Sequence, residues 1–286
     1  MRLTKEQLNS YDENGYLLVS DCFSPDEVES IAHELPRVFD ENTPRKVLER
    51  SGAVRSVFAP HVSNETFDRL SRHPRMLEPA QQLLDDDVYI HQFKINAKVA
   101  LEGDQWEWHQ DFVYWHREDS MPAPRALTAV LFMQEVNEFN GPMLVIPGSH
   151  KEGMLDIIKF DKFFPGALTP EQLEQAGTSW ANTLTADLKY KIRKDILARM
   201  ALKNEIRAIK GSAGSVLFFH SLLLHASSNN LSPWDRVCVF VTYNSVSNTL
   251  GWRPDPRPEY IAHRDFSPLI PLSQDALMEV EEVGAL

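Results

Sequence analysis

The chain has 286 residues, of which 43% are hydrophobic and 10% aromatic, so it has enough apolar side chains for a large core. It carries 29 Lys and Arg against 41 Asp and Glu, which gives a formal net charge of -12. This acidic balance argues against nucleic acid and against an anionic membrane as partners, because both bind basic proteins.

The N-terminal segment MRLTKEQLNSYDENGY is polar and has no apolar core of a signal peptide. No apolar run in the sequence reaches the length of a membrane span. The two cysteines, Cys22 and Cys238, match no metal-binding spacing. We therefore expect a cytoplasmic protein with reduced thiols.

The first 86 residues are predicted to be mostly helical. Ser24-Pro25-Asp26-Glu27 combines three signals of a helix start, namely an N-cap, a proline at the first helical position and a capping box. The helix that it opens is expected to bury one face through Val28, Ile31 and Leu35. The other expected elements are a short helix after Thr4, a strand at 16–20 and a helical stretch at 64–86 that breaks near His73-Pro74.

In the segments 87–150 and 211–250, apolar and polar residues alternate, and β-branched and aromatic side chains are frequent. Clusters of Gly, Pro, Asn and Asp separate the alternating runs. Short strands with such turns between them predict a mainly β fold with flanking helices, in which the strands form an antiparallel sandwich or barrel. The expected strands are 88–99, 125–136, 143–150, 214–228 and 235–247.

The alternating pattern lapses between residues 151 and 210. TPEQLEQA (169–176) and DLKYKIRKDILARMALK (187–203) have helical spacing, so we expect a helical insertion between two strands. Such an insertion is compatible with a lid over the barrel mouth and equally with a packing helix. Residues 251–286 are expected to form a C-terminal tail. Because no linker divides the chain, we expect residues 1–286 to form a single domain.

The stretch WHQDFVYWH places a histidine and a carboxylate two residues apart, at His109 and Asp111. Residues i and i+2 of a strand point to the same side, so both side chains would aim together. Two histidines and one carboxylate hold Fe(II) on one face and leave its other positions open. The pair alone is equally compatible with buried polar side chains, so a metal site requires a third ligand from elsewhere in the chain.

The candidates for this third ligand are His220 and His225 in FFHSLLLHASS. Five other histidines are set aside because they lie in predicted helices, turns, loops or the tail, namely His33, His61, His73, His150 and His263, and His116 is too near to the pair. In a continuous strand His220 and His225 face opposite sides, so only one points inward. Arg236 opens the next strand and is expected to lie beside the strand that ends in His225. A 2-oxoglutarate-type cosubstrate needs such an arginine for its far carboxylate, which favours His225 as the ligand.

With these residues the chain resembles the phytanoyl-CoA dioxygenase (PhyH) superfamily of Fe(II)/2-oxoglutarate-dependent oxygenases along nearly its whole length. YIHQFKINAKVALEGDQWEWHQDFVYWHREDSMP is similar to the corresponding block of bacterial ectoine hydroxylases and, in HQFKINAK and WHQD, to free L-proline trans-4-hydroxylases. NGPMLVIPGSH and LLHASSNNLSPWDR are also similar to both. The resemblance implies a double-stranded β-helix (jelly-roll or cupin-like) core and one oxygenase domain.

The resemblance also implies roles for single residues. His109, Asp111 and His225 would bind Fe(II), and Arg236 would hold the distal carboxylate of 2-oxoglutarate. The cosubstrate site would also include Lys98, Thr128 and Ser227, and the substrate pocket would include Gln92, Trp115 and Phe240.

The implied reaction is hydroxylation of an unactivated C–H bond with O2, with ascorbate as a reductant in vitro. The implied substrate is a small zwitterion, free L-proline or a related cyclic amino acid, with ectoine or another amino-acid-like metabolite as the alternative. FFHSLLLH and REDSM depart from the superfamily's usual versions, which bears on the substrate more than on the reaction class.

Other interpretations remain open on the residues themselves. A non-catalytic metal-binding barrel or a zinc hydrolase would use the same three ligands, although the hydrolase has no evident use for Arg236. Lys98 is as compatible with a solvated strand lysine as with a cosubstrate ligand. Glu118 and Asp119 are expected either to recognise a substrate amine or, more simply, to solvate a loop after Trp115. The chain is compatible with a monomer or a homodimer.

Overall fold

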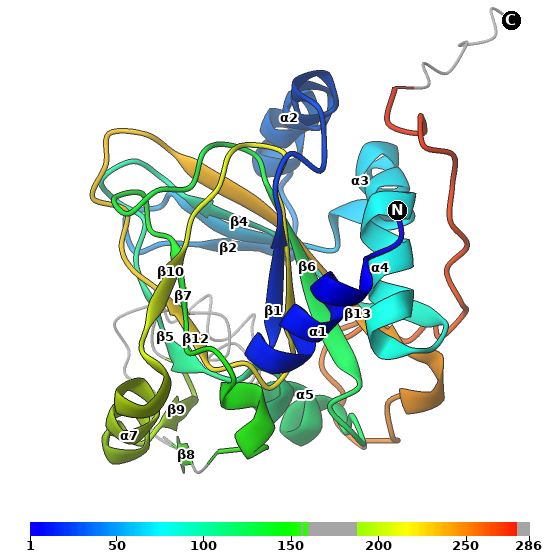
Figure 1. The fold of residues 1–286 in the computed structure, drawn as a ribbon. Coiled ribbons are helices and arrows are strands. Elements are labelled where there is room, and N and C mark those ends of the chain that lie inside the picture. The colour runs from blue at the N-terminus through cyan, green and yellow to red at the C-terminus, as the bar shows by residue number, and fades with distance from the viewer. Residues whose placement is uncertain (156, 160–187, 279–286) are drawn as a thin grey trace, which may run out of the picture.

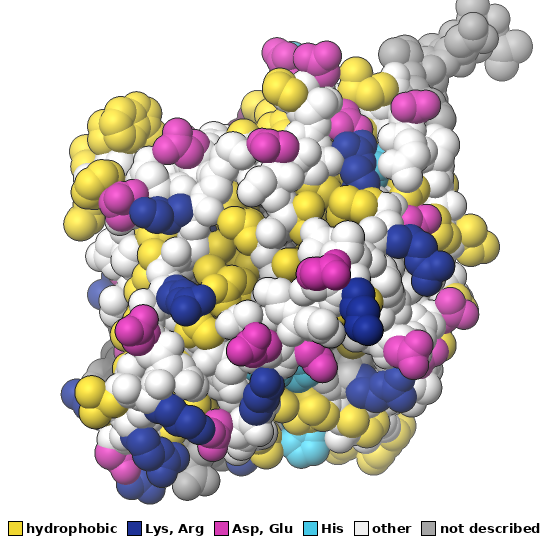
Figure 2. Space-filling model, in the orientation of Figure 1, with side chains coloured by type: hydrophobic (Ala, Val, Ile, Leu, Met, Phe, Trp, Pro, Cys, Tyr) yellow, Lys and Arg dark blue, Asp and Glu magenta, His cyan; other side chains and the backbone are white. Residues whose placement is uncertain are grey.

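The structure, a computed structural model, describes residues 1–155, 157–159 and 188–278 (Figure 1). None of the helices in these ranges is long and apolar enough to cross a membrane. On the face drawn in Figure 2, basic and acidic side chains are interspersed. The helices are α1 (Lys5–Asn14), α2 (Pro25–Asp40), α3 (Glu65–Ser71), α4 (Pro74–Leu84), α5 (Asp111–Asp119) and α7 (Lys194–Asn204).

Two antiparallel sheets build the core of these ranges, which confirms the predicted mainly β fold with a jelly-roll core. In order across the sheet, the larger consists of β1 (Tyr16–Val19), β11 (Val216–His220), β6 (Ala126–Phe132), β13 (Arg236–Ser245), β4 (Val88–Lys98), β3 (Val54–Phe58) and β2 (Lys46–Leu48). The smaller consists of β10 (Arg207–Ile209), β7 (Met143–Val145), β12 (His225–Ser227) and β5 (Trp106–His109), while β8 (Ile157–Lys159) pairs with β9 (Tyr190–Ile192).

The larger sheet is buried on both faces, as the alternation along β13 shows. Val239 and Val241 belong to the apolar cluster that the sheet forms with the helices before β4, which lie beside it in Figure 1. Cys238 and Phe240 point the other way and pack with Val145 of the smaller sheet. The inner face is therefore closed by the second sheet, and a pocket forms between the two where polar side chains replace apolar ones.

The helix signals of the N-terminal part are confirmed. The Ser24 hydroxyl accepts from the Glu27 N–H, and the Glu27 carboxylate accepts from the Ser24 N–H at 2.9 Å, so the capping box is complete. The predicted break near His73-Pro74 separates α3 from α4, because Pro74 starts a new helix that His73 caps. Strands β2 and β3, at one end of the larger sheet, were not predicted from the sequence.

The predicted strand 214–228 is wrong as one element. It divides into β11 and β12, which belong to different sheets, and the apolar run Ser221–Leu224 turns between them. The Leu223 N–H donates to the His220 carbonyl at 2.8 Å and closes this turn. Alternation along a single strand was therefore not the correct basis for choosing between His220 and His225. The two histidines lie in different sheets, and only His225 lies in the smaller one.

The described part of the predicted helix 187–203 forms β9 and α7 rather than a single helix, because Tyr190–Ile192 pairs with β8. The predicted helix 169–176 lies outside the described residues. The C-terminal tail runs beside α4 and α3 (Figure 1), and the Leu269 N–H donates to the carbonyl of Val88 at 2.9 Å.

Candidate metal centre and pocket

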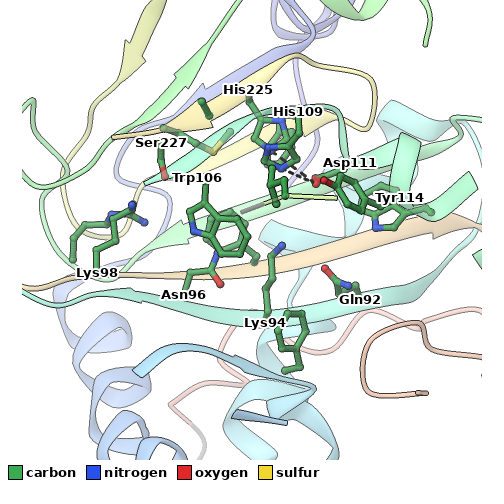
Figure 3. A pocket seen from close by; sticks show the side chains of 18 of the residues that line it. Gln92, Lys94, Asn96, Lys98, Trp106, His109, Asp111, Tyr114, His225 and Ser227 are labelled. Carbon is green, nitrogen blue, oxygen red and sulfur yellow. Dashed lines mark ion pairs between the residues drawn. The ribbon is translucent and has the colours of Figure 1, made fainter. Parts of the chain in front are cut away.

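Three side chains converge at the start of α5 (Figure 3). His109 ends β5 and lies opposite His225, the first residue of β12, in the register of the smaller sheet. The Nε2 atoms of His109 and His225 lie 3.5 Å and 3.9 Å from Oδ1 of Asp111. One ligand atom from each residue lies within 4.8 Å of the others, which is the spacing that a single metal ion requires.

The predicted reason for this convergence was wrong. His109 and Asp111 do not share one face of a strand, because β5 ends at His109 and Asp111 is the first residue of α5. The buried side chain of Gln110 fixes the turn between them. Its amide donates to the carbonyl of Leu222 at 2.7 Å, and its oxygen accepts from the N–H of Leu155 at 2.9 Å.

Both histidines are held in the tautomer that a metal requires. Nδ1 of His109 donates to the carbonyl of Glu107 at 2.7 Å, and Nδ1 of His225 donates to that of Leu223 at 2.9 Å. Each Nε2 then carries a lone pair and faces Asp111. Two imidazole nitrogens and one carboxylate oxygen, open on the pocket side, form a donor set that fits Fe(II).

The local charges keep this donor set in its metal-binding form. Burial alone would raise the pKa of Asp111, but His225, His109 and Lys94 outweigh it, so the net pKa lies well below its usual range. Burial and, next, the neighbouring His109 lower the pKa of His225 to about 4. At neutral pH the site therefore presents a carboxylate and a neutral imidazole.

One end of the pocket is cationic. Arg236 and Lys98 lie opposite each other on β13 and β4, and both line the pocket together with Ser227 of β12. The guanidinium of Arg236 donates to the carbonyls of Asn140 and Gly141 and has no carboxylate partner among the described residues. The Ser227 hydroxyl is buried without a hydrogen-bond partner there, as expected of a group that faces a ligand.

Arg236 reaches the pocket by another route than predicted. β13 pairs with β4 and β6, whereas β12 pairs with β5 and β7, so Arg236 is not on a strand adjacent to His225. The two residues instead face the pocket from opposite sheets. The sequence predicted that the strands of Arg236 and His225 are neighbours in one sheet. They belong instead to two sheets that stack across the pocket.

Lys98 is not a solvated strand lysine. It is 2% exposed, and its ammonium donates to the carbonyls of Asp104 and Ser228. Burial and, next, Arg236 lower its pKa to about 6. Thr128 lies elsewhere: its hydroxyl is 2.9 Å from that of Thr242, and it is not among the residues that line the pocket. The structure therefore brings Lys98, but not Thr128, to the cationic end.

The other end of the pocket is lined by Gln92, Trp115 and Phe240, the three residues proposed to contact the substrate. Gln92 is anchored from behind, because its amide nitrogen donates to the carbonyl of Ile261 at 2.8 Å. Its carbonyl oxygen is thereby left as an acceptor for the pocket. Trp115 lies within α5 rather than in a loop, on the side of the helix that packs against His91.

Lys94 also lines the pocket, although no role was predicted for it from the sequence. It lies between Gln92 and Asn96 on the same face of β4, and Figure 3 shows its side chain rising toward the metal ligands. Burial lowers its pKa, and the negative charge of Asp111 raises it in part. Its contacts are with the rings of Trp106 and Phe240, and no carboxylate forms an ion pair with it among the described residues.

Glu118 and Asp119 do not solvate a loop. The Glu118 carboxylate accepts from Lys189 at 2.7 Å and from the Tyr190 hydroxyl, and Asp119 is 1% exposed and paired with Arg257. Arg257 comes from the C-terminal tail and lines the pocket. Helical spacing of the apolar residues between Asp111 and Asp119 was the sequence signal that would have predicted α5 and placed both residues on it.

Comparisons with known proteins agree with this geometry. The family model described as phytanoyl-CoA dioxygenase (PhyH) matches residues 11–238. The chain is 36% identical to L-proline trans-4-hydroxylase of Streptomyces griseoviridis, over 93% of this chain and 95% of that protein. It is 34% identical to ectoine dioxygenase of Bordetella bronchiseptica, over 97% of this chain and 88% of that protein.

Solved structures of EctD from S. alaskensis have the same fold. The form with bound Fe matches with a TM-score of 0.76 and 29% identity, and it covers 94% of this chain and 87% of EctD. The form with 2-oxoglutarate and 5-hydroxyectoine also has a TM-score of 0.76. The epimerase SnoN, at 18% identity and a TM-score of 0.62, shares the fold alone.

Proposed function

This chain belongs to the phytanoyl-CoA dioxygenase family, and we propose that it hydroxylates a C–H bond of a small zwitterion, free L-proline or a related cyclic amino acid. The reaction class is that of its relatives, an Fe- and 2-oxoglutarate-dependent dioxygenase. When bound, iron and 2-oxoglutarate supply the oxidising power, with O2 as the oxidant and ascorbate keeping the iron reduced in vitro.

The chain's own residues would hold these groups in place. His109, Asp111 and His225 would bind the iron through two nitrogens and one oxygen. Arg236 would pair with the distal carboxylate of 2-oxoglutarate, and Ser227 would donate its otherwise unpaired hydroxyl to the same molecule. Lys98 would hold the surrounding loops beside Arg236 through its two carbonyl contacts.

The observation that carries the substrate class is the pair Lys94 and Gln92. Two residues apart on one strand, they face the same side, roughly 7 Å apart along β4. Lys94 offers a cation without a carboxylate partner among the described residues, and Gln92 offers a carbonyl oxygen fixed by Ile261. A carboxylate and an amine on one small molecule would satisfy both groups, and the stem of that molecule would contact Phe240 and Trp115.

Ectoine is the second candidate, because ectoine dioxygenases are among the curated relatives and EctD has the same fold. The two candidates are separated by incubating the iron-loaded enzyme with 2-oxoglutarate, ascorbate and one compound at a time from L-proline, pipecolate, ectoine and an acyclic amino acid. Mass spectrometry then identifies the compound that gains one oxygen atom. Activity with zinc in place of Fe(II) would favour a hydrolase instead.

Replacing Lys94 by methionine is expected to raise the KM for the hydroxylated compound by about 10- to 100-fold, because a charged hydrogen bond contributes about 1.5–3 kcal/mol. The KM for 2-oxoglutarate should stay within about twofold of the wild-type value. Lys203→Met, which removes an exposed lysine paired with Glu152, is the control. A rise in the KM for 2-oxoglutarate alone would instead assign Lys94 to the cosubstrate.

Replacing Gly141 by alanine is expected to disturb the cationic end. Gly141 has φ +78°, and an added Cβ would lie 2.5 Å from Cδ of Lys98 and 2.9 Å from the carbonyl oxygen of Ser228. The left-handed backbone alone costs about 1–3 kcal/mol of stability. The crowding should further raise the KM for 2-oxoglutarate by about tenfold, because Lys98 must move.

Gly52→Ala is the matched control for this variant. Gly52 also has positive φ, at +91°, but nothing lies within 4 Å of an added Cβ. It should therefore lower the melting temperature without changing the KM for 2-oxoglutarate. Equal KM values for the two variants would contradict a role of the Lys98 environment in cosubstrate binding.

A further inference from the structure

The start of α5 departs from the usual way in which a helix is capped. Gln110 is the N-cap residue, but its side chain makes no hydrogen bond to the helix. An N-cap side chain normally accepts from the free N–H groups of the first turn. Here the N–H of Phe112 donates instead to the carbonyl of Ser221 at 3.0 Å, in the turn between β11 and β12. The side chain of Gln110, which is 1% exposed, is therefore available for other partners.

Those partners are backbone groups of two other segments. The amide nitrogen of Gln110 donates to the carbonyl of Leu222 at 2.7 Å and to that of Gly153 at 3.0 Å. The amide oxygen accepts from the N–H of Leu155 at 2.9 Å. Both amide hydrogens are thereby used, and Gln110 is not among the residues that line the pocket. The amide therefore joins chain segments rather than binding a ligand.

The first of these segments leads to a metal ligand. Leu222 lies in the turn between β11 and β12, and His225 begins β12. This turn is bound to the start of α5 twice, once through the Ser221 carbonyl and once through the Leu222 carbonyl. The two hydrogen bonds therefore determine how far His225 lies from the ligands on either side of Gln110.

The second segment, residues 153–155, leads to β8, which pairs with β9. β9 is in turn bound to α5, because the Tyr190 N–H donates to the Tyr114 hydroxyl at 3.2 Å. The pair of strands is therefore held against α5 at two places, at the start of the helix by Gln110 and one turn later by Tyr114. The conformation of residues 153–155 is thus linked to the position of α5.

We propose that Gln110 is a positioning residue for the metal centre: by joining the start of α5 to both segments, its amide holds the three ligands at the separation that binds iron. This rests on the proposed function, because it assumes that His109, Asp111 and His225 bind Fe(II). Removing a group that orients metal ligands typically weakens metal binding by about 10- to 100-fold. The affinity for Fe(II) should therefore depend on an amide that does not line the pocket.

The test compares two glutamines whose amides bind the backbone. Gln110→Met keeps the length of the side chain and removes all its hydrogen bonds, and Gln110→Glu keeps the acceptor for Leu155 but loses both amide hydrogens. Gln82→Met is the control, because the Gln82 amide accepts from the Leu3 N–H at 2.8 Å and donates to the Leu3 carbonyl at 3.1 Å, away from the pocket. Each variant is expected to lower the melting temperature of the metal-free protein.

Anaerobic titration with Fe(II) alone gives the dissociation constant of each protein. For both Gln110 variants we expect a Kd raised about 10- to 100-fold, whereas Gln82→Met should keep the wild-type Kd. A folded Gln110 variant with the wild-type Kd would overturn the proposal, because the amide would then be purely structural. A wild-type protein that does not bind Fe(II) would contradict the proposed function instead.

Amide hydrogen exchange of the wild-type protein gives a second test that needs no variant. If the contacts of Gln110 favour iron binding, iron binding must reciprocally stabilise these contacts. The Leu155 N–H is therefore expected to exchange about tenfold more slowly with Fe(II) than without it. The Leu3 N–H, which the Gln82 amide holds in the same way, should exchange equally fast in both states. An unchanged exchange rate at Leu155 would overturn the proposal even if the Gln110 variants do not fold.

Discussion

Asp111→Ala is expected to abolish hydroxylation, with succinate formation reduced by about 1000-fold or more, because it removes the one carboxylate of the metal centre. The remaining histidines would present two nitrogen ligands and no carboxylate, a set that binds Fe(II) weakly. The fold should persist, since an acidic residue in the first turn of a helix contributes only about 0.3–1 kcal/mol. Iron per protein after anaerobic reconstitution and succinate formation are the two measurements.

The control for this variant is Asp195→Ala, which removes an exposed acidic residue from the first turn of α7. It should bind iron and form succinate as the wild-type protein does. Iron binding and turnover that survive in Asp111→Ala would exclude His109, Asp111 and His225 as the ligand set. His225→Ala should lose iron in the same way, which checks that the effect belongs to the site rather than to α5.

Arg236→Lys is expected to raise the KM for 2-oxoglutarate by about 100-fold while kcat at saturation falls much less. The guanidinium offers a planar fork to a carboxylate, whereas an ammonium offers a single point of contact and would lie beside a second lysine, Lys98. Added 2-oxoglutarate should therefore restore turnover. Iron content should not change, because Arg236 does not contact the metal ligands.

Arg207→Lys, on the exposed part of β10, is the control for this variant and should leave the KM for 2-oxoglutarate unchanged. If Arg236→Lys raised the KM for the substrate instead, the two ends of the pocket would be assigned the wrong way round. The KM values for 2-oxoglutarate and for the substrate together therefore show which end of the pocket binds which molecule.

The elements that local rules govern were predictable from the sequence. The capping box at Ser24 and Glu27 and the break at Pro74 depend on residues within one turn, and both formed as predicted. The alternation of residue types along β4 and β13 likewise predicted strands correctly, because one face of each strand points toward the second sheet. His109, Asp111 and His225 also lie close together, as predicted, although Asp111 reaches the site from a helix.

Relations across the two sheets were not predictable in the same way. Whether Ser221–Leu224 continues a strand or turns between sheets depends on packing partners far along the chain. Asp119 and Arg257 form an ion pair although 138 residues separate them in the sequence. Each lies in a segment whose composition is typical of a solvated loop. No role was predicted for Lys94 for a similar reason, because the register of β4 against its neighbours decides which of its residues face the pocket.

The most direct test of the proposed reaction is the fate of labelled O2 in the presence of L-proline. The enzyme is loaded with Fe(II), given 2-oxoglutarate and ascorbate, and exposed to oxygen-18 gas, and the products are separated by mass spectrometry. We expect one labelled oxygen atom in the hydroxylated amino acid, one in succinate, and equal amounts of the two products. Succinate without a labelled product from L-proline or any other compound of the panel would contradict hydroxylation of a small zwitterion.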